Sequence, residues 1–315
     1  MRVRGGTNAG SSASAKHSAT ARLGFQATTW GATAIVANRA GTWKSAGASV
    51  TARALSSGKD VRDGILGGSL DAGSLGATPF IVGAAKGQVT AVAVGAYAGN
   101  TLAVVVGKNS DIHNIADLKG KKIGSQLGST TNQIFVDKIA KSAGLTKSDY
   151  QLVNIKFQDM YSALATGQVD AFAGVDPTPT LAVVKGTGRI LTTYEHYDPT
   201  PLYLCFTKPF IKAHPGAVQK TVNGWVAAAK LFKSDPNRVD TEVKAFFDSR
   251  GASIKMSVLQ KALKNLDVTP DFRKNTDQYL TQQAKSLIGQ GAISSVPDWS
   301  KAIDARFLKK AESGS

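Results

Sequence analysis

An α/β protein built from two similar lobes is the fold class that this sequence predicts. The pattern Gly-x-x-Asp-Ala occurs twice, at residues 68–72 and 167–171. Two further segments, Gly-Phe-Gln at 24–26 and Gly-Ser-Gln at 124–126, each open a polar loop that a helical pattern follows. In open α/β sheets the ligand lies beyond the carboxyl ends of the strands, where these loops fall. Two alike lobes in tandem therefore predict a ligand-binding cleft between them.

The first half of the chain alternates between strand and helix patterns. Apolar or alternating runs predict strands, and helical spacing that ends near glycine predicts helices. The predicted strands are 22–26, 50–55, 69–74, 89–94 and 102–106, and the predicted helices are 33–39, 59–66 and 78–85.

The second half repeats this alternation and then becomes mainly helical. Strands are predicted at 121–125, 151–155, 169–173, 189–193 and 202–207, with helices at 132–142, 161–165 and 179–185. Four helices follow, at 217–233, 240–249, 257–265 and 271–287, the first of them long and amphipathic.

Two polar segments, 109–119 and 194–200, are the expected chain crossings between the lobes. They divide the chain into a first lobe at 21–108 and 202–312 and a second lobe at 109–201. Residues 1–20 are rich in Gly, Ser and Ala and lack the apolar region of a signal peptide, so we expect a disordered leader. Two crossings predict a hinge that closes around a ligand.

Composition narrows the function classes. The chain has 315 residues, 42% of them hydrophobic, and a net charge of +16. Basic residues are scattered, with one tight group at 119–122, so nucleic acid is not an expected partner. Steering of an anionic solute and a basic surface without a specific role both remain open. The single cysteine, Cys205, lies in an apolar run and is expected to pack as a small core residue.

Four segments share the order strand, short polar loop, helix start: 26–30, 74–78, 128–132 and 174–177. Free backbone N–H groups at a helix start carry partial positive charge, and neighbouring hydroxyl groups cap the helix or donate to a ligand. Such loops accept phosphate, sulfonate or carboxylate groups without Lys or Arg. Each loop alone is more often a simple cap, but four in matching positions favour a ligand site.

Individual residues in and near these loops have two interpretations each. Trp30 either walls in a small ligand or packs against its own lobe. Asp176 is interpreted first as a helix N-cap with Pro177 at N1, and second as a partner for a substrate ammonium group. Asp71 and Asp170 occupy equivalent positions, so a turn or strand-end role is more plausible than a catalytic pair.

Motifs of common enzymes are missing from the sequence. The four histidines form no metal-ligand pattern with each other or with the cysteine, and neither a G-x-S-x-G turn nor a phosphate-binding P-loop is present. We therefore expect no cofactor and no enzymatic activity.

The chain resembles the periplasmic substrate-binding proteins of ABC importers, in the group that takes up nitrate, sulfonates, taurine and thiamine precursors. The resemblance rests on the segments 57–60, 70–73, 78–87, 115–124, 163–171 and 176–177. It implies a type II periplasmic binding protein fold of two doubly wound α/β lobes, a periplasmic or cell-surface location, a membrane permease as partner and a monomeric state. Val175 departs from the family, because an aromatic residue often precedes the Asp-Pro pair.

Ligand contacts carried over from the resemblance fall on nine residues: Gln26, Thr28, Trp30, Ser74, Leu75, Gly76, Ser129, Thr130 and Asp176. The expected solute is a small anion or zwitterion of the alkanesulfonate or taurine type, its tail flanked by Trp30 and Leu75. One alternative is an enzyme on the same fold, similar to menaquinone-pathway dehydratases, that uses Asp71, Asp170 or Asp176 as acid or base. The other is a binding module that reports to a signalling partner.

Overall fold

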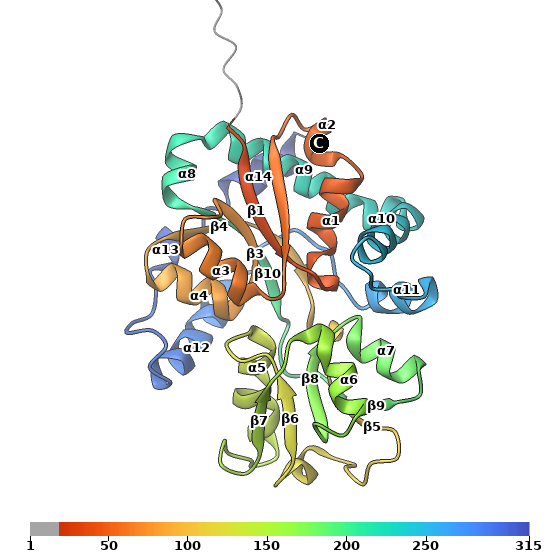
Figure 1. The fold of residues 1–315 in the computed structure, drawn as a ribbon. Helices are drawn as coiled ribbons and strands as arrows, with labels where there is room; N and C mark the ends of the chain where they lie inside the picture. The colour runs from red at the N-terminus through yellow and green to blue at the C-terminus, as the bar shows by residue number, and fades with distance from the viewer. Residues whose placement is uncertain (1–18, 315) are drawn as a thin grey trace, which may run out of the picture.

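The computed structural model describes residues 19–314, which form two α/β lobes joined end to end (Figure 1). Most of the leader predicted at 1–20 lies outside the described residues. Ala19 and Thr20 precede the first strand, and the Thr20 hydroxyl lies 2.8 Å from that of Ser49.

The first lobe is built on a five-stranded sheet in the order β2-β1-β3-β10-β4. Only β10 runs antiparallel to its neighbours, β3 and β4. The strands are β1 (Ala21–Gln26), β2 (Val50–Leu55), β3 (Ala72–Gly76), β4 (Val89–Tyr97) and β10 (Pro201–Thr207).

The second lobe repeats this sheet in the order β7-β6-β8-β5-β9. Its antiparallel member is β5, which pairs with β8 and β9. The strands are β5 (Leu102–Gly107), β6 (Lys122–Ser125), β7 (Gln151–Asn154), β8 (Ala171–Val175) and β9 (Gly188–Thr193). Each sheet therefore receives its antiparallel strand directly from the other lobe.

This topology corrects the predicted position of the first crossing. The chain leaves the first sheet after β4 and enters the second at β5, so the crossing occupies residues 98–101 instead of 109–119. The composition of β5 could not assign this strand to one lobe, because a buried apolar strand fits the core of either sheet equally well. The return crossing, 194–200 between β9 and β10, lies where it was predicted.

Helices cover both faces of the first sheet (Figure 1). One face packs on α1 (Ala32–Arg39), α2 (Thr42–Ser45), α9 (Pro215–Ser234), α10 (Pro236–Asp248) and α14 (Arg306–Ser313). The other packs on α3 (Gly58–Leu66), α4 (Ala77–Ala85), α12 (Thr276–Gly289) and α13 (Trp299–Ala302). Two helices lie at the margins, α8 (Lys208–Ala213) and α11 (Met256–Lys264).

The second lobe has fewer helices. Its sheet is covered by α5 (Thr130–Ile134), which continues as the π-helix η4 (Phe135–Ala140), and by α6 (Met160–Ala165) and α7 (Thr178–Val184). Short 3-10 turns complete the fold: η1 (Thr29–Gly31), η2 (Gly99–Thr101), η3 (Ile115–Leu118) and η5 (Phe157–Asp159). Among the described residues no helix is both long and apolar enough to cross a membrane.

The repeated Gly-x-x-Asp-Ala pattern has one structural cause in both lobes. Gly68 and Gly167 adopt positive φ angles of 75° and 72° and end the preceding helices. Two backbone N–H groups then donate to a carbonyl inside the helix, that of residue 64 in one lobe and 163 in the other. This closure delays each following strand by two or three residues, so β3 and β8 begin later than the predicted 69 and 169.

The two aspartates of the pattern fix the starts of the neighbouring strands. Asp71 accepts a hydrogen bond from the backbone N–H of Arg22 (3.0 Å), and Asp170 accepts one from that of Lys122 (2.8 Å). Asp71 also forms an ion pair with the Arg22 guanidinium (2.7 Å), which holds the pKa of its carboxyl below the usual range. Both carboxylates lie at strand starts, away from the strand ends that face the cleft, which confirms a structural role.

A buried carboxylate joins the return crossing to both lobes. Asp198 is 1% exposed and accepts hydrogen bonds from Lys138 of η4 (2.7 Å) in the second lobe. It also accepts from Tyr279 (2.9 Å) and Gln283 (3.0 Å) of α12 in the first lobe, and from the Thr200 backbone N–H (2.7 Å). These bonds offset the cost of burying the charge and fix the hinge segment between the lobes.

Candidate functional site

Loops at the carboxyl ends of the strands in the two lobes meet directly. The backbone N–H and the hydroxyl of Thr29 both donate to the carbonyl oxygen of Asp176, at 3.1 and 2.9 Å. The Thr78 N–H donates to the Thr130 hydroxyl at 3.1 Å. These bonds connect the loops after β1 and β3 of the first lobe with those after β8 and β6 of the second. The structure is therefore a closed arrangement of the cleft.

The Trp30 side chain is buried between the first crossing and the end of β3. It is 4% exposed, and its indole N–H donates to the Thr101 hydroxyl in the first crossing (2.7 Å). The ring also approaches Gly76, where an added Cβ would lie 3.2 Å from the Trp30 ring and 2.5 Å from the Thr130 hydroxyl. Gly76 is therefore a point of close approach at which the two lobes and the indole come together.

Asp176 caps a helix from one position further out than predicted. Its carboxylate accepts from the Thr180 N–H (3.1 Å), while Pro177 occupies the N-cap of α7 instead of N1. The second carboxylate oxygen accepts from the Asn265 amide at 3.3 Å. Burial raises the pKa of this carboxyl, and its hydrogen bonds oppose that shift. The predicted positions, Asp176 at the N-cap and Pro177 at N1, are therefore wrong, although the Asp176 carboxylate does cap the first turn of α7. The ammonium interpretation stays open.

Several buried hydroxyl groups in the loop region lack a protein partner within the described part of the chain. They belong to Ser74 in the middle of β3, Ser125 at the end of β6 and Thr131 in the first turn of α5, which are 2%, 0% and 0% exposed. A buried polar atom without a partner costs about 1–3 kcal/mol. Ser125 and Thr131 lie at the cleft ends of their elements, and Ser74 lies two residues before the end of β3. A polar ligand would satisfy such unpartnered hydroxyl groups.

The other predicted contact residues are buried, and their placements differ. Thr28 accepts from the Trp30 N–H (3.2 Å), and Ser129 accepts from the Asn132 N–H (3.1 Å), so both hydroxyls cap helical turns. The Gln26 side chain is 2% exposed and lies beside Gly58 at the start of α3.

Leu75 contradicts the expectation that it would flank a ligand tail with Trp30. Its side chain belongs to the hydrophobic cluster beneath α3 and α4, whereas Trp30 belongs to the cluster on the opposite face of the same sheet. The cause is strand alternation, because successive side chains of β3 point to opposite faces. Ser74 and Gly76, the neighbours of Leu75 in β3, lie on the face of the sheet that carries Trp30, where Leu75 was expected.

A cavity of about 620 Å³ opens beside the meeting loops and is lined by both lobes. Its walls are mainly apolar, and three charged residues, Asp60, Lys156 and Arg250, lie among them. Thr28 is the one predicted contact residue that lines it. The other lining residues are Ala27, Ala54, Leu55, Ser56, Phe157, Gln158, Pro177, Thr178, Leu181, Phe247, Ala252, Ser253 and Ile254.

Sequence reasoning missed most of this cavity. The segments 54–60 and 156–158 follow β2 and β7, so the rule that ligands lie beyond the carboxyl ends of strands could have included them. Residues 247–254 join α10 to α11 and carry no comparable signal. A second cavity of about 330 Å³ lies towards the crossings, and Asp176 lines it together with Thr101 and Asn265.

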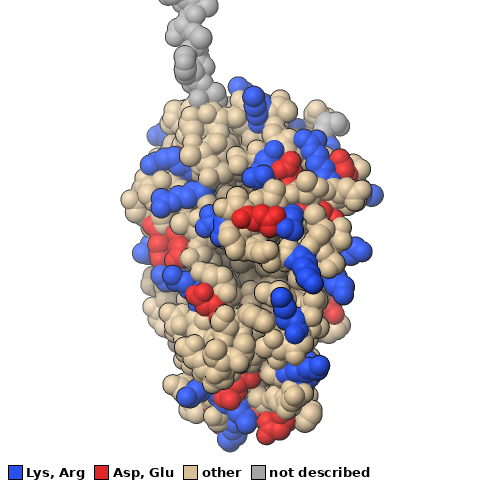
Figure 2. Space-filling view, turned by 45° about the vertical axis from the view of Figure 1, so that its right-hand side comes forward, with Lys and Arg blue, Asp and Glu red and all other residues tan. Residues whose placement is uncertain are grey.

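Charge is not concentrated into one patch on the face turned forward in Figure 2. Lys and Arg are spread over both lobes there and are interspersed with Asp and Glu. This distribution matches the prediction of scattered basic residues and differs from the stripe or patch typical of nucleic-acid binding.

The model of the NMT1-like family matches residues 14–244. The chain belongs to this family. Two sequence relatives are named as sulfonate-binding proteins. The putative aliphatic sulfonates-binding protein of Escherichia coli K12 is 29% identical over 168 residues, which cover 53% of this chain and about half (52%) of that protein. The one from Bacillus subtilis 168 is 25% identical over 262 residues, 81% of this chain and 76% of that protein.

Solved structures that share this chain's fold include binding proteins and an enzyme. The alkanesulfonate-binding protein SsuA of Xanthomonas axonopodis, bound to MOPS, superimposes with a TM-score of 0.81 at 19% identity, covering 92% of this chain and all of that one. The nitrate-binding protein NrtA of Synechocystis gives 0.75 at 15% identity, covering 95% and 89%. The desulfurization enzyme DSZB gives 0.69 at 15% identity, covering 94% and 99%. The type II periplasmic binding protein fold is thereby confirmed.

Proposed function

We propose that this chain binds a small organic anion between its two lobes, as the solute-binding component of an ABC-type importer. Two observations carry the proposal: polar loops of the two lobes contact each other directly, and three buried hydroxyl groups of this region have no partner among residues 19–314. Membership of the NMT1-like family and the names of the sulfonate-binding relatives support the same function.

The head group of the solute is an oxyanion held by hydroxyl and backbone N–H donors. Ser74 contributes from the first lobe, and Ser125 and Thr131 contribute from the second, so the anion binds both lobes at once. Neutral donors suit a sulfonate or carboxylate, because hydrogen bonds to a charged acceptor are about twice as strong as neutral ones. Binding through both lobes stabilises the closed form over an open one.

The body of the solute occupies the adjoining cavity of about 620 Å³. Phe157, Phe247 and Ile254 give that cavity apolar walls, each of them less than 10% exposed. An inorganic ion such as nitrate leaves such a space unfilled, whereas an organic sulfonate gains from burying its apolar part. The cavity therefore favours the sulfonate class over nitrate. Of its three charged residues, two are cationic, Lys156 and Arg250, and one is the carboxylate Asp60, so the net charge of the lining attracts anions.

The location and partners follow from the same role. We infer a periplasmic or cell-surface protein that acts as a monomer and delivers its solute to a membrane permease. The two crossings allow the lobes to move as rigid bodies about the hinge at Asp198, which is the closure motion of two-domain binding proteins.

A panel of solutes in a thermal unfolding assay tests the proposal. The protein is unfolded, washed free of ligand, refolded and melted with alkanesulfonates, taurine, aromatic sulfonates, aromatic acids, pyrimidines, bicarbonate or nitrate. A solute at about 1,000 times its dissociation constant stabilises the native state by about 4 kcal/mol. We expect a rise in melting temperature with organic sulfonates and none with nitrate. A panel without any rise would contradict the proposal.

Chemical conversion of a bound solute would favour an enzyme instead. The likeness to DSZB concerns the fold alone. Cys205, the one cysteine of the chain, is fully buried in β10, and this burial raises the pKa of its thiol. Such a thiol is a poor nucleophile. Mass spectrometry of a bound sulfonate after several hours should return it unchanged.

A further inference from the structure

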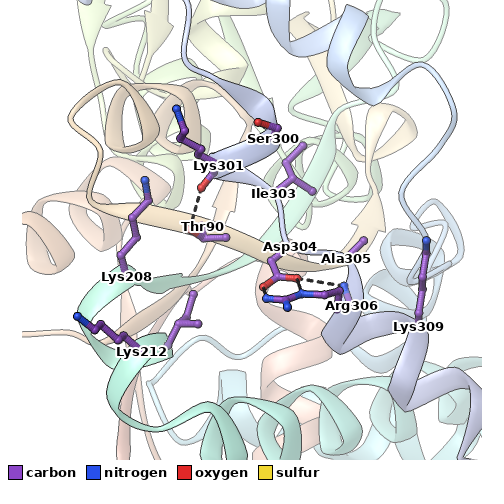
Figure 3. Close-up of a pocket in the computed structure, with 11 residues that line it drawn as sticks. Thr90, Lys208, Lys212, Ser300, Lys301, Ile303, Asp304, Ala305, Arg306 and Lys309 are labelled. Carbon is purple, nitrogen blue, oxygen red and sulfur yellow. Dashed lines mark hydrogen bonds and ion pairs between the residues drawn. The ribbon is translucent and has the colours of Figure 1, made fainter.

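A third concave site lies on the first lobe, away from the cleft (Figure 3). It has a volume of about 650 Å³ and lies between α8 on one side and the segment 300–309 on the other, with Thr90 of β4 on its floor. We call it the basic groove. Its lining residues all belong to the first lobe: Thr90, Lys208, Ile211, Lys212, Ser300, Lys301, Ile303, Asp304, Ala305, Arg306 and Lys309.

Backbone bonds hold both walls of the basic groove in place. The Asp304 N–H donates to the carbonyl oxygen of Ala91 (2.8 Å), which ties one wall to the start of β4. The Lys208 N–H donates to the carbonyl oxygen of Gln88 (3.1 Å), which ties α8 to the turn before the same strand. The groove is therefore part of the sheet framework and does not depend on the position of the second lobe.

The groove holds more positive charge than its carboxylates neutralise. Five of its side chains are cationic, and two of these have carboxylate partners: Arg306 pairs with Asp304 (2.8 Å) and Lys301 with Asp298 (2.8 Å). Within residues 19–314, Lys208, Lys212 and Lys309 have no carboxylate within ion-pair distance.

The positions of two lysines are unfavourable for the helix that carries them. Lys208 and Lys212 stand four residues apart on α8, where like charges repel. Figure 3 shows both of them on the same side of the groove, with Lys301 across from Lys208 and Lys309 at the far end beyond Arg306. Charges spread along a groove match an extended anion better than a single compact one.

We propose that the basic groove binds a phosphate-type anion that carries several charges, either free in solution or displayed as the headgroups of anionic lipids. The lysine ammonium groups act as mobile point charges on the anion, and Arg306 is held by Asp304 at the centre. The apolar side chains of Ile211 and Ile303 lower the local dielectric and strengthen these attractions.

Calorimetric titration with tripolyphosphate at low salt tests the site. The double variant Lys208→Ala/Lys212→Ala should bind about tenfold more weakly, and the wild-type affinity should fall steeply as salt is added. The control is Lys141→Ala/Lys147→Ala, which removes the same charge from exposed positions of the second lobe and should leave the affinity within about twofold. The variant Lys208→Arg/Lys212→Arg keeps the charge and should retain binding.

Sedimentation with phospholipid vesicles distinguishes the two sources of the anion. Binding to phosphatidylglycerol vesicles that depends on Lys208 and Lys212, without binding of tripolyphosphate, would assign the site to lipid headgroups. Binding of tripolyphosphate alone would assign it to a free anion, and both results support the site. Equal weakening by the groove and control variants, or no binding of either probe to the wild type, would overturn it. The cleft solute plays no part in these measurements.

Discussion

The two lobes share one sheet topology and differ in the residues that face each other across the cleft. Corresponding positions follow from the antiparallel strand of each sheet: Ser74 pairs with Leu204 in the first lobe, as Ala173 pairs with Val104 in the second. The first lobe thus places a hydroxyl where the second has a methyl group. The two sheets are therefore alike in topology, while residues at corresponding positions of their strands differ.

At the starts of the same strands, in contrast, the two lobes have the same residue in the same role. Asp71 and Asp170 make the same backbone hydrogen bond in the two lobes. Positions that hold the sheet together are therefore alike, and positions that form the cleft are not. Variants at matched positions can test whether framework positions and cleft positions differ in this way. The first is Asp198, which is hydrogen-bonded to both lobes.

Loss of Asp198 should have the largest effect. Asp198→Ala leaves Lys138, Tyr279 and Gln283 without their shared acceptor in a buried site, and we expect it to lower the free energy of unfolding by about 3–5 kcal/mol. The matched variant in the other crossing is Thr101→Val, which removes the acceptor of the Trp30 indole and the donor to the Ala98 carbonyl oxygen and should cost about 1–3 kcal/mol. Urea denaturation measures both. Equal losses would mean that the return crossing is no more strongly fixed than the first.

Closure of the cleft should be the next most sensitive property. Gly76→Val introduces the residue found at the matching position of the second lobe, Val175. Its side chain would collide with Thr130 across the cleft, where an added Cβ lies 2.5 Å from the hydroxyl. The lobes would stay folded but remain apart, so fewer molecules would reach the closed form. Because only the closed form binds tightly, solute affinity should fall about a hundredfold.

Small-angle scattering provides a test of the Gly76→Val variant that needs no ligand. The radius of gyration should exceed that of the wild type, while circular dichroism stays the same. An unchanged radius together with unchanged solute affinity would show that the contact between Gly76 and Thr130 does not limit closure.

Much of this framework could be predicted from the sequence, because the repeated pattern and the strand alternation are local signals. The error at the first crossing arose because β5 is equally apolar in either lobe, so its sheet partners were set by long-range pairing. Leu75 was misjudged for a related reason. The strand was predicted to end at residue 74, which placed Leu75 in the following loop. β3 continues to Gly76, so Leu75 lies inside the strand and follows its alternation.

The two strand-start aspartates should differ in how much they stabilise the protein. Asp71→Ala removes an ion pair as well as a backbone bond and should cost about 1–2 kcal/mol at pH 7, against about 1 kcal/mol for Asp170→Ala. The folded-state pKa of Asp71 lies below its ordinary value of 3.8. Its stabilisation is therefore complete above that pH and is lost as the pH falls through the folded-state pKa. Unfolding curves between pH 7 and pH 3 should show the wild type approaching Asp71→Ala. A constant gap would contradict the role of the ion pair.

Exchange of Ser74 and Ala173 should give the smallest change in stability and the clearest separation of the lobes. Ser74→Ala removes a buried hydroxyl that has no partner among the described residues, so the unliganded protein should become more stable by about 0.5–1 kcal/mol. If that hydroxyl donates to the solute, the same variant should weaken binding about tenfold. Ala173→Ser places a hydroxyl at the matching buried position of the second lobe and should destabilise the protein by about 1 kcal/mol without changing the affinity. In the first lobe the variant would then raise stability and weaken binding. In the second lobe the variant would lower stability and leave binding unchanged. If Ser74→Ala left the affinity unchanged, the donors of the first lobe would have to be backbone N–H groups, and the cleft would be polar through its helix starts alone.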